Sequence, residues 1–423
     1  MFDFDVCIIG TGRVGLPLGL AFVDAGLKAI GYDINADLRS QINQGTMPFR
    51  EPGFDAIIAK KQFEVSDNIA VAARAKNIII TVGTPLHEHI ESDLRQLQRV
   101  IEELTPVLRP GHFLGLRSTV APRTTTFVKR FIEKKSSLRV GVDLGLAFCP
   151  ERIAEGCAYE ELKTLPQVVG CEDTLSKEAS SQLFETISPK VLHTSFLNAE
   201  LVKLFTNAER YVHFALANQF ALVADTLDGN IYEIQSLANY EYPRNQLASP
   251  GLTAGACLRK DFGMINEWNP YPDILLSAWK MNESIPLFLV DHLRRRTTLI
   301  DQRVAILGYT FKQDSDDIRD SLVPKLYRYL QRECPHSIKV SDHNLTAEIL
   351  DPVNGTLTNT SWEEATEDAD VVFVATNHNG YDEVLKTLST TRPDCWIVDI
   401  WNVGGTGQIF YQAQAIADLG SDG

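Results

Sequence analysis

The sequence predicts an α/β protein with two doubly wound, Rossmann-like parallel-sheet domains joined by a long-helix, all-α connector. Three observations predict this fold class. Short β-branched runs alternate with amphipathic segments near both ends of the chain, which is the pattern of βαβ units. The middle of the chain has helical spacing and no strand-like run. The 423 residues are enough for two or three domains, which we expect at 1–195, 196–300 and 301–423.

Each expected element follows from its local pattern. In the first block, apolar runs predict strands at 6–9, 28–32, 77–82, 112–120, 140–148 and 168–170. The connector opens with one helix over 198–227, because apolar residues recur at helical spacing until Asp228-Gly229-Asn230 ends the pattern. In the last block, similar runs predict strands at 303–307, 337–341, 370–375 and 395–399, with a first helix over 321–331.

Composition excludes several classes of protein. With 44% hydrophobic and 22% charged residues, the chain is an ordinary globular one. No apolar run approaches the ~18 residues of a membrane span, and the N-terminus lacks a signal-peptide pattern. The formal net charge of −15 argues against non-specific nucleic-acid binding. The seven cysteines contain no CxxC pair, which is typical of a reduced, cytosolic set. We therefore expect a cytoplasmic protein without membrane or nucleic-acid partners, and we assign no metal ligands.

A glycine-rich motif follows the first expected strand. The segment Gly10-Thr-Gly-Arg-Val-Gly15 matches G-x-G-x-x-G and leads into an amphipathic segment, as a dinucleotide site requires. The glycines let the backbone approach a pyrophosphate, and the helix N-terminus supplies N–H donors. Asp33 ends the next expected strand, where a carboxylate can hold a ribose 2′-hydroxyl and favour NAD over NADP. The motif with its carboxylate predicts an NAD site.

Several polar residues could carry chemistry. Cys257 follows a run of small residues and is followed by Lys260 and Asp261. A nearby cation lowers the pKa of a thiol and raises its thiolate fraction, although most cysteines of this kind are structural. Lys203 and Asn207 are spaced i, i+4 on the long expected helix, so they share a face. They fit either an oxyanion clamp in a cleft or a solvent-facing pair.

A further charged cluster follows the expected strand at 140–148. Glu151, Arg152 and Glu155 stand at the carboxyl edge of the sheet, where doubly wound folds bind ligands. These three residues fit either a ligand site or the solvated charges of a loop.

Taken together, these segments resemble the UDP-glucose/GDP-mannose 6-dehydrogenase family, from about residue 4 to about residue 403. Eight motifs appear in the order of that family. They are the Gly10 loop, Glu51-Pro-Gly53, Val82-Gly-Thr84-Pro85, Ser118-Thr119-Val120, Pro150-Glu151-Arg152, Lys203 with Asn207, Cys257-x-x-Lys260-Asp261, and Gly308-Tyr-Thr-Phe311-Lys312, the last of which runs into Asp316–Ser321. The resemblance implies NAD as cofactor, a nucleotide-sugar substrate and a homodimer.

The resemblance also implies a mechanism. The C6 alcohol of a nucleotide-linked hexose would be oxidised twice, with Cys257 forming a thiohemiacetal and then a thioester that water hydrolyses to a uronic acid. Lys203 and Asn207 would stabilise the oxyanion, with Lys203 also taking the alcohol proton. Asp261 and Glu151 would handle water and protons with the Thr119 hydroxyl. The implied catalytic residues are Cys257, Lys203, Asn207, Asp261, Glu151 and Thr119.

The remaining roles come from the same resemblance. The implied cofactor-binding residues are Gly10, Gly12, Arg13, Val14, Gly15, Asp33, Thr84, Ser118, Thr119, Glu155 and Arg319, the last reaching the cofactor across the domain cleft. The implied substrate-binding residues are Glu151, Arg152, Lys203, Asn207, Gly251, Phe311 and Lys312. The products of such enzymes usually feed surface polysaccharide, so the resemblance implies that pathway.

The identity of the sugar depends on a few positions. Arg152 after the Pro-Glu pair is similar to UDP-N-acetylhexosamine members, whereas Lys260 before Asp261 is more like the UDP-glucose branch. We favour a UDP-N-acetylhexosamine. Ala254 stands where the family usually has glycine, Leu252-Thr253 replace the Phe-Gly often seen there, and Trp401 stands where an arginine often contacts the substrate. These departures concern sugar recognition more than chemistry.

Two other classes stay open at this point. A two-electron dehydrogenase of the 6-phosphogluconate or hydroxyacid type would share the first domain and the long helix. It would need neither a nucleophilic Cys257 nor a second α/β block. A nucleotide-sugar binder without catalysis is compatible with Ala254 and Trp401, but the intact set of catalytic side chains disfavours it. The number of NADH molecules formed per sugar would distinguish the classes.

Overall fold

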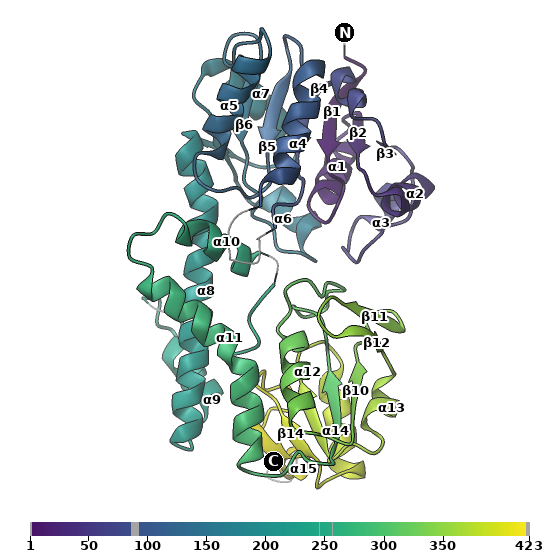
Figure 1. Cartoon of the computed structure of the whole chain (residues 1–423), viewed down its shortest axis with the longest axis vertical. Helices are drawn as coiled ribbons and strands as arrows, with labels where there is room; N and C mark the ends of the chain where they lie inside the picture. Colours follow the sequence, from purple (N-terminus) through teal and green to yellow (C-terminus); the bar gives the residue numbers. More distant parts are fainter. Residues whose placement is uncertain (1, 86–92, 245, 256, 420–423) are drawn as a thin grey trace. The chain divides into compact units, whose positions relative to one another are not determined.

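The computed structural model describes residues 2–85, 93–244, 246–255 and 257–419 (Figure 1). The chain forms two compact units. The first consists of Met1–Thr206 and Gly263–Asn269, and the second of Asn207–Phe262 and Pro270–Gly423. Each unit is built on its own mostly parallel sheet, so the predicted α/β class with two Rossmann-like domains is confirmed. In the described part of the chain, no helix is both long enough and apolar enough to cross a membrane.

The first unit contains an eight-stranded sheet in the order β3-β2-β1-β4-β5-β6-β7-β8. Neighbouring strands are parallel except β6 and β7, where Phe148 pairs antiparallel with Gly170. The order reverses beside β1, which places a switch point at the carboxyl ends of β1 and β4. The strands are β1 (Phe4–Ile9), β2 (Ala29–Tyr32), β3 (Glu64–Ser66), β4 (Ala75–Ile80), β5 (Phe113–Leu116), β6 (Gly145–Phe148), β7 (Gln167–Gly170) and β8 (Val191–Thr194).

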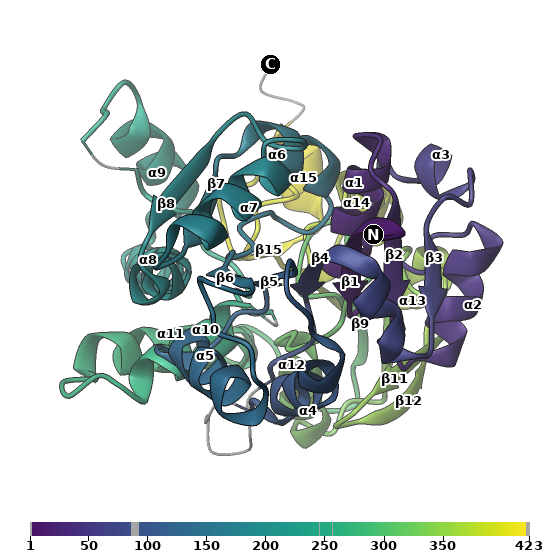
Figure 2. The same ribbon diagram turned by 90° about the horizontal axis from the view of Figure 1, so that it is seen from above.

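Helices cover both faces of this sheet because its central strands are apolar on both sides. One core joins the sheet to α1, α3, α6 and α7, and the other joins it to α4 and α5. In Figure 2, seen from above, α1, α6 and α7 lie on one side of this sheet, and α4 and α5 lie on the other. The helices of this unit are α1 (Gly15–Asp24), α2 (Ala36–Gln44), α3 (Asp55–Ile58), α4 (Arg95–Leu104), α5 (Thr124–Lys135), α6 (Ala158–Thr164) and α7 (Thr174–Phe184).

The connector is helical, as predicted. The helix expected over 198–227 is α8 (Phe196–Thr226). The predicted stop signal is also the start of the next helix, because the Asn230 side chain accepts hydrogen bonds from the N–H groups of Tyr232 and Glu233 and caps α9 (Ile231–Asn239). Two more helices follow, α10 (Leu258–Asn266) and α11 (Asp273–Arg294).

The second unit contains a five-stranded sheet in the order β10-β9-β13-β14-β15, in which only β15 is antiparallel. Parts of α8 and α11 pack with α12 (Val323–Arg332) on one face, and α13 (Trp362–Thr366), α14 (Tyr381–Thr391) and α15 (Gln414–Leu419) lie on the other. The strands are β9 (Arg303–Leu307), β10 (Ser337–Ser341), β13 (Val371–Val374), β14 (Trp396–Val398) and β15 (Phe410–Gln412), with a separate hairpin of β11 (Glu348–Asp351) and β12 (Gly355–Thr358).

Candidate active site

The glycine loop joins β1 to α1 in the geometry that a dinucleotide requires. Gly10 has a φ of 92°, a conformation that favours glycine. A Cβ at Gly15 would lie 1.9 Å from the carbonyl oxygen of Gly10, so no side chain fits at this position. A Cβ at Gly12, in contrast, would meet nothing within 4 Å, which leaves open space at the N-terminus of α1. The loop therefore fits a pyrophosphate.

Asp33 lies at the end of β2 and is tied to this loop. Its Oδ2 accepts a hydrogen bond of 2.7 Å from the N–H of Thr11, and its Oδ1 accepts one of 2.9 Å from the N–H of Asn35. These bonds hold the carboxylate beside the glycine loop, where it can still accept a ribose hydroxyl.

An ion pair connects the glycine loop to the loop that follows β6. The Arg13 guanidinium lies 2.5 Å from the Glu155 carboxylate and stacks over the Phe49 ring, 5.0 Å from its centroid. Glu51 accepts hydrogen bonds from the N–H groups of Gly156 and Ala158, at 2.8 and 2.9 Å. The structure thus brings the predicted residues Arg13 and Glu155 together and gives Glu51 a role in shaping the loop.

The segments after β4 and β5 are held side by side. The Thr84 hydroxyl donates to the carbonyl oxygen of Thr119 at 2.6 Å, and the Ser118 hydroxyl donates to that of Val82 at 2.7 Å. Thr84 and Ser118 are buried, whereas Thr119 is half-buried. The two hydroxyls therefore stabilise the turn that presents Thr119.

Glu151 lies in a buried network that the motif Pro150-Glu151-Arg152 does not predict. Its Oε2 contacts Nε and Nη2 of Arg117, both at 2.6 Å, and its Oε1 accepts hydrogen bonds from the N–H groups of Arg152 and Ile153. Arg117 is 1% exposed, and its Nη1 also donates to Gln167 at 3.0 Å. The only signal in the sequence was an arginine inside an otherwise apolar strand run.

In the second unit, the structure brings Asn207 and Asp261 together. The Asn207 amide donates to the Asp261 carboxylate at 2.5 Å, although 54 residues separate them. Both side chains are buried. Lys203, which is also buried, lies one turn before Asn207 on α8 and so shares its face.

Cys257 immediately precedes α10 and is exposed. Its carbonyl oxygen accepts a hydrogen bond of 2.9 Å from the N–H of Asp261, and this bond closes the first turn of α10. The buried cysteines differ from it, because burial raises the pKa of the Cys149 and Cys395 thiols to about 12 and raises that of Cys7 as well. These three behave as apolar core residues.

Two glycines before Cys257 are packed against aromatic rings. A Cβ at Gly255 would lie 2.5 Å from the Phe311 ring, and a Cβ at Gly251 would lie 2.2 Å from the Trp401 ring. The N–H of Gly255 also donates to the carbonyl oxygen of Asp320 at 3.0 Å. Phe311 and Trp401 thus shape the backbone that leads to Cys257.

The other predicted residues lie at the surface of their units. Arg152 is exposed and Lys312 is half-buried. Arg319 is 60% exposed at its side chain and forms a two-nitrogen ion pair with Asp317, with contacts of 2.6–3.0 Å. The predicted residues are divided between the units. The first unit holds the predicted cofactor-binding residues other than Arg319, together with Glu151, Arg152 and Lys203. The second unit holds Asn207, Gly251, Cys257, Asp261, Phe311, Lys312 and Arg319.

Three family models match successive parts of the chain. The NAD binding domain of the UDP-glucose/GDP-mannose dehydrogenase family matches residues 4–188, its central domain matches 197–284, and its UDP binding domain matches 305–405. A relative from Methanocaldococcus jannaschii, described as a UDP-N-acetyl-D-mannosamine dehydrogenase, is 30% identical over 94% of this chain and 92% of its own. The chain belongs to the UDP-glucose/GDP-mannose dehydrogenase family. It is accordingly an NAD-dependent nucleotide-sugar dehydrogenase that oxidises the C6 position of its substrate.

Solved structures agree with this assignment. The UDP-D-ManNAc dehydrogenase from Pyrococcus horikoshii superposes with a TM-score of 0.83 at 28% identity, covering 92% of this chain and 93% of that one. The UDP-N-acetyl-mannosamine dehydrogenase Cap5O from Staphylococcus aureus gives a TM-score of 0.78 at 26% identity, covering 89% and 90%. Both the predicted family and the predicted cofactor are therefore confirmed.

Proposed function

We propose that this dehydrogenase oxidises a UDP-N-acetylhexosamine to its uronic acid in two steps, with a covalent intermediate on Cys257. The observation that carries the proposal is the buried pair of Asn207 and Asp261, held at the helix that Cys257 precedes. The backbone N–H groups at the start of α10 favour an anionic sulfur at this position. Because Cys257 is exposed, its sulfur can be reached by a substrate.

The chain's own residues supply the acid–base and electrostatic parts of the reaction. Lys203 takes the proton of the C6 hydroxyl. Two NAD⁺ molecules, bound one after the other at the glycine loop, would each supply the acceptor for one hydride. The Cys257 thiolate then adds to the aldehyde carbon, and Lys203 with the Asn207 amide stabilises the negative oxygen of the adduct. Oxidation of this thiohemiacetal leaves a thioester.

Hydrolysis releases the product and regenerates the enzyme. Asp261 activates the water that attacks the thioester carbon, and the carbon–sulfur bond breaks to return Cys257 as a thiolate. One primary alcohol and one water are converted to one carboxylate, with two hydrides and three protons removed. The Thr119 hydroxyl assists the proton transfers, whereas the four contacts of Glu151 support a role in fixing the loop that carries Arg152 and Glu155.

The cofactor and substrate residues complete the proposal. Gly10, Gly12, Arg13, Val14 and Gly15 hold the pyrophosphate, Asp33 holds the ribose, and Thr84 with Ser118 shapes the neighbouring wall. Phe311, Lys312 and Gly251 hold the nucleotide sugar, and Arg319 contacts the cofactor. The relatives named as UDP-N-acetyl-D-mannosamine dehydrogenases, together with Arg152 after the Pro-Glu pair, support an N-acetylhexosamine as the sugar. Surface polysaccharide as the destination of the product and the cytoplasm as the location of the enzyme stay predictions.

A homodimer is part of the proposal. Leu216, Phe220 and Val223 are between 41% and 52% exposed and recur on one face of α8. An apolar stripe of this kind on a helix is typical of an interface. A second copy of the same helix would cover the stripe and create a symmetric contact.

The decisive experiment incubates the protein with NAD⁺ and a panel of UDP- and GDP-sugars and follows the absorbance of NADH. Two NADH per UDP-N-acetylhexosamine are expected. One NADH per sugar would indicate a two-electron dehydrogenase, and none would indicate a binder without catalysis. Faster turnover of UDP-glucose or GDP-mannose would overturn the choice of sugar and leave the reaction in place.

A further inference from the structure

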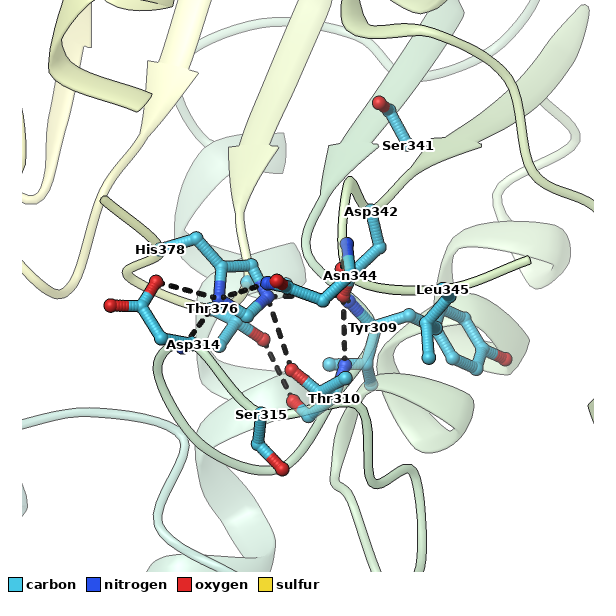
Figure 3. A network of polar contacts seen from close by, with 12 residues as sticks. Tyr309, Thr310, Asp314, Ser315, Ser341, Asp342, Asn344, Leu345, Thr376 and His378 are labelled. Carbon is cyan, nitrogen blue, oxygen red and sulfur yellow. Dashed lines mark hydrogen bonds and ion pairs between the residues drawn. The ribbon is translucent and has the colours of Figure 1, made fainter. Parts of the chain in front are cut away.

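In the second unit, three loops meet at the carboxyl ends of the neighbouring strands β10, β9 and β13 (Figure 3). The loop after β9 carries Gly308–Lys312, the loop after β10 begins with Asp342, and the loop after β13 carries His378. Gly308 has a φ of 88°, and a Cβ there would lie 2.5 Å from the Thr376 side chain. The three loops are therefore in close contact at this edge.

Asp342 fixes the start of the loop after β9. Its Oδ2 accepts hydrogen bonds from the N–H groups of Tyr309 and Thr310, at 2.7 and 3.2 Å. Its Oδ1 accepts one from the N–H of Asn344 at 2.9 Å. Burial acts to raise the pKa of Asp342, but the bonds from His378 and the backbone outweigh burial and lower it. The side chain is therefore a carboxylate that accepts from several donors at once.

His378 is fully buried beside this carboxylate, and its neighbours define its tautomer. Its Nε2 lies 3.1 Å from Asp342 Oδ2, so Nε2 carries the hydrogen. The same nitrogen lies 3.1 Å from the Thr310 hydroxyl. Its Nδ1 lies 2.8 Å from the backbone nitrogen of Asp314, a donor, so Nδ1 must be the acceptor. One ring thus ties the two ends of the segment 310–314 together.

The segment held in this way carries two of the proposed substrate residues. The Thr376 hydroxyl donates to the carbonyl oxygen of Thr310 at 2.7 Å, and the Thr310 hydroxyl donates to that of Lys312 at 3.0 Å. Phe311 lies between these points, and its ring packs against Gly255, two residues before Cys257. A shift of the segment would move the Phe311 ring and the backbone that leads to Cys257.

We propose that Asp342 and His378 are a positioning pair, which holds the segment 309–314 in the conformation that seats the nucleotide part of the substrate. The pair acts through Phe311 and Lys312 and touches no reacting atom, so it sets substrate affinity. The inference deepens the proposed function and rests on it for the identity of the ligand. It assigns a purpose to a buried histidine that the proposed reaction leaves unused.

A metal centre is the competing interpretation of this cluster. One ligand atom each from Asp314, His343 and His378 lies within 4.8 Å of the others. However, the lone pair of His378 Nδ1 already accepts the Asp314 N–H, and the Asn344 amide lies 3.2 Å from the same atom. A cation could bind His378 only by displacing these donors, so the hydrogen-bonded arrangement favours positioning.

The test compares His378→Phe, His378→Gln and His378→Asn with the wild type and with the matched control His343→Ala, which removes the exposed neighbouring ring. In His378→Phe, we expect the KM for the UDP-sugar to rise about tenfold, as loss of a hydrogen bond that holds the segment predicts, with an unchanged KM for NAD⁺. Glutamine can restore the donor to Asp342, and asparagine can restore the acceptor for Asp314. Each should therefore recover part of the loss.

Two further measurements keep the outcome clear. Hydrogen exchange at the amides of Tyr309 and Asp314 should be faster in His378→Phe, and UDP should bind more weakly in calorimetry, neither of which requires turnover. If His378→Phe does not fold, Thr310→Val can be used in its place, because it exchanges only a hydroxyl for a methyl group. Thr310→Val should show a smaller increase in amide exchange and a smaller loss of UDP binding. If the wild type oxidises no UDP-sugar, the proposed function fails, while weaker binding of UDP by His378→Phe would still support the positioning role.

Other results would overturn the inference. A merely structural histidine would lower the melting temperature and leave both KM values unchanged, because the fraction of folded enzyme alters the rate and not the KM. An equal rise in the KM for NAD⁺ would also contradict a role confined to the nucleotide sugar. A rise in melting temperature with Zn²⁺ alone, present in the wild type and absent in His343→Ala, would favour the metal centre instead.

Discussion

The guanidinium of Arg117 and the carboxylate of Glu151 form a buried ion pair at the ends of two neighbouring strands, with nitrogen–oxygen contacts of 2.6 Å. The other oxygen of the carboxylate accepts hydrogen bonds from the backbone N–H groups of Arg152 and Ile153, so both oxygens of Glu151 are bound within the protein. Charges buried in this way are stable only while both partners are present.

Replacing Arg117 with Met should therefore be costly. The substitution leaves the Glu151 charge buried without its partner and is expected to lower the free energy of unfolding by about 3–5 kcal/mol. The double variant with Glu151→Gln removes the charge and should recover part of this loss. Urea unfolding of the wild type and the two variants measures both effects. A cost of less than about 1 kcal/mol for the single change would contradict a structural role for the pair.

Cys257→Ser tests the covalent mechanism. The first hydride transfer does not need sulfur, so the variant should still form some NADH. An oxygen nucleophile is harder to generate, and the yield of uronic acid should fall by at least ~10³. Cys7→Ser and Cys395→Ser are controls, because both residues are buried and should cost stability without changing the chemistry. Near-wild-type formation of uronic acid by Cys257→Ser would replace the four-electron mechanism with a two-electron one.

Alkylation provides an independent measurement on the same residue. Cys257 is exposed and precedes a helix, whereas Cys149 has its pKa raised to about 12 by burial. Iodoacetamide should therefore label Cys257 faster than the buried Cys7, Cys149 and Cys395. Bound nucleotide sugar should protect Cys257 and leave the labelling of the exposed Cys157 and Cys334 unchanged. Mass spectrometry of timed samples would show the order of labelling.

The choice of cofactor depends on Asp33. Its carboxylate is held beside the glycine loop and should repel a 2′-phosphate, so NAD⁺ should be preferred over NADP⁺ by roughly tenfold or more in kcat/KM, which corresponds to about 1.4 kcal/mol. Asp33→Asn should reduce the preference by removing the repulsion. Equal efficiency of the wild type with both cofactors would show that Asp33 does not have this role.

Substitutions in the exposed apolar stripe on α8 test whether the protein is a homodimer. Phe220→Glu or Leu216→Glu places a charge at an apolar position that a second copy would cover, and the protein should dissociate to monomers. Both positions are 41–42% exposed in the single chain, so the monomer should remain folded. Light scattering and thermal melting measure the two properties, and an unchanged mass would exclude this face as the interface.

His112 should make stability depend on pH. Burial and the nearby charge of Arg109 lower its pKa to about 4, whereas the unfolded chain takes up the proton near 6.5. Between these values the unfolded state binds more protons, so stability falls as the pH falls, by up to about 1.4 kcal/mol per pH unit. His112→Asn keeps an acceptor for the Arg109 N–H and does not titrate. The difference in unfolding free energy between the two proteins should therefore change between pH 6.5 and 4, and a constant difference would contradict the shift.

Local patterns predicted the parts of the site that lie close together in sequence. The Gly10 loop and Asp33 belong to one βαβ unit, so their spacing was sufficient to predict the NAD site. The contact of Asn207 with Asp261 could not be predicted from spacing. The helical repeat indicates that Lys203 and Asn207 share a face of their helix, but it does not indicate which distant segment packs against that face. Arg117 was missed for a similar reason, since its partner Glu151 lies in the loop after the next strand, 34 residues further along the chain.

The sequence patterns also did not predict the two edge strands of the first sheet, β3 and β8. In β3 only Val65 is buried, and in β8 no residue is, so neither strand carries an apolar run that would predict it. The strands expected over 112–120 and 140–148 are shorter in the structure, because residues 117–120 lie beyond the end of β5 and residues 141–143 form a turn before β6. On α8, Leu216 and Phe220 fit the helical repeat of a core yet are exposed, because periodicity does not distinguish a face inside the chain from one available to another chain.

The packing of Trp401 on Gly251 restricts how this enzyme could change its substrate. Any side chain at 251 would collide with the indole, whose Nε1 is anchored to the carbonyl oxygen of Ala375. A larger residue at 251 would require the indole to leave first. Position 401 must therefore change before position 251 or together with it, so an evolutionary path or a redesign that begins at 251 passes through a damaged intermediate.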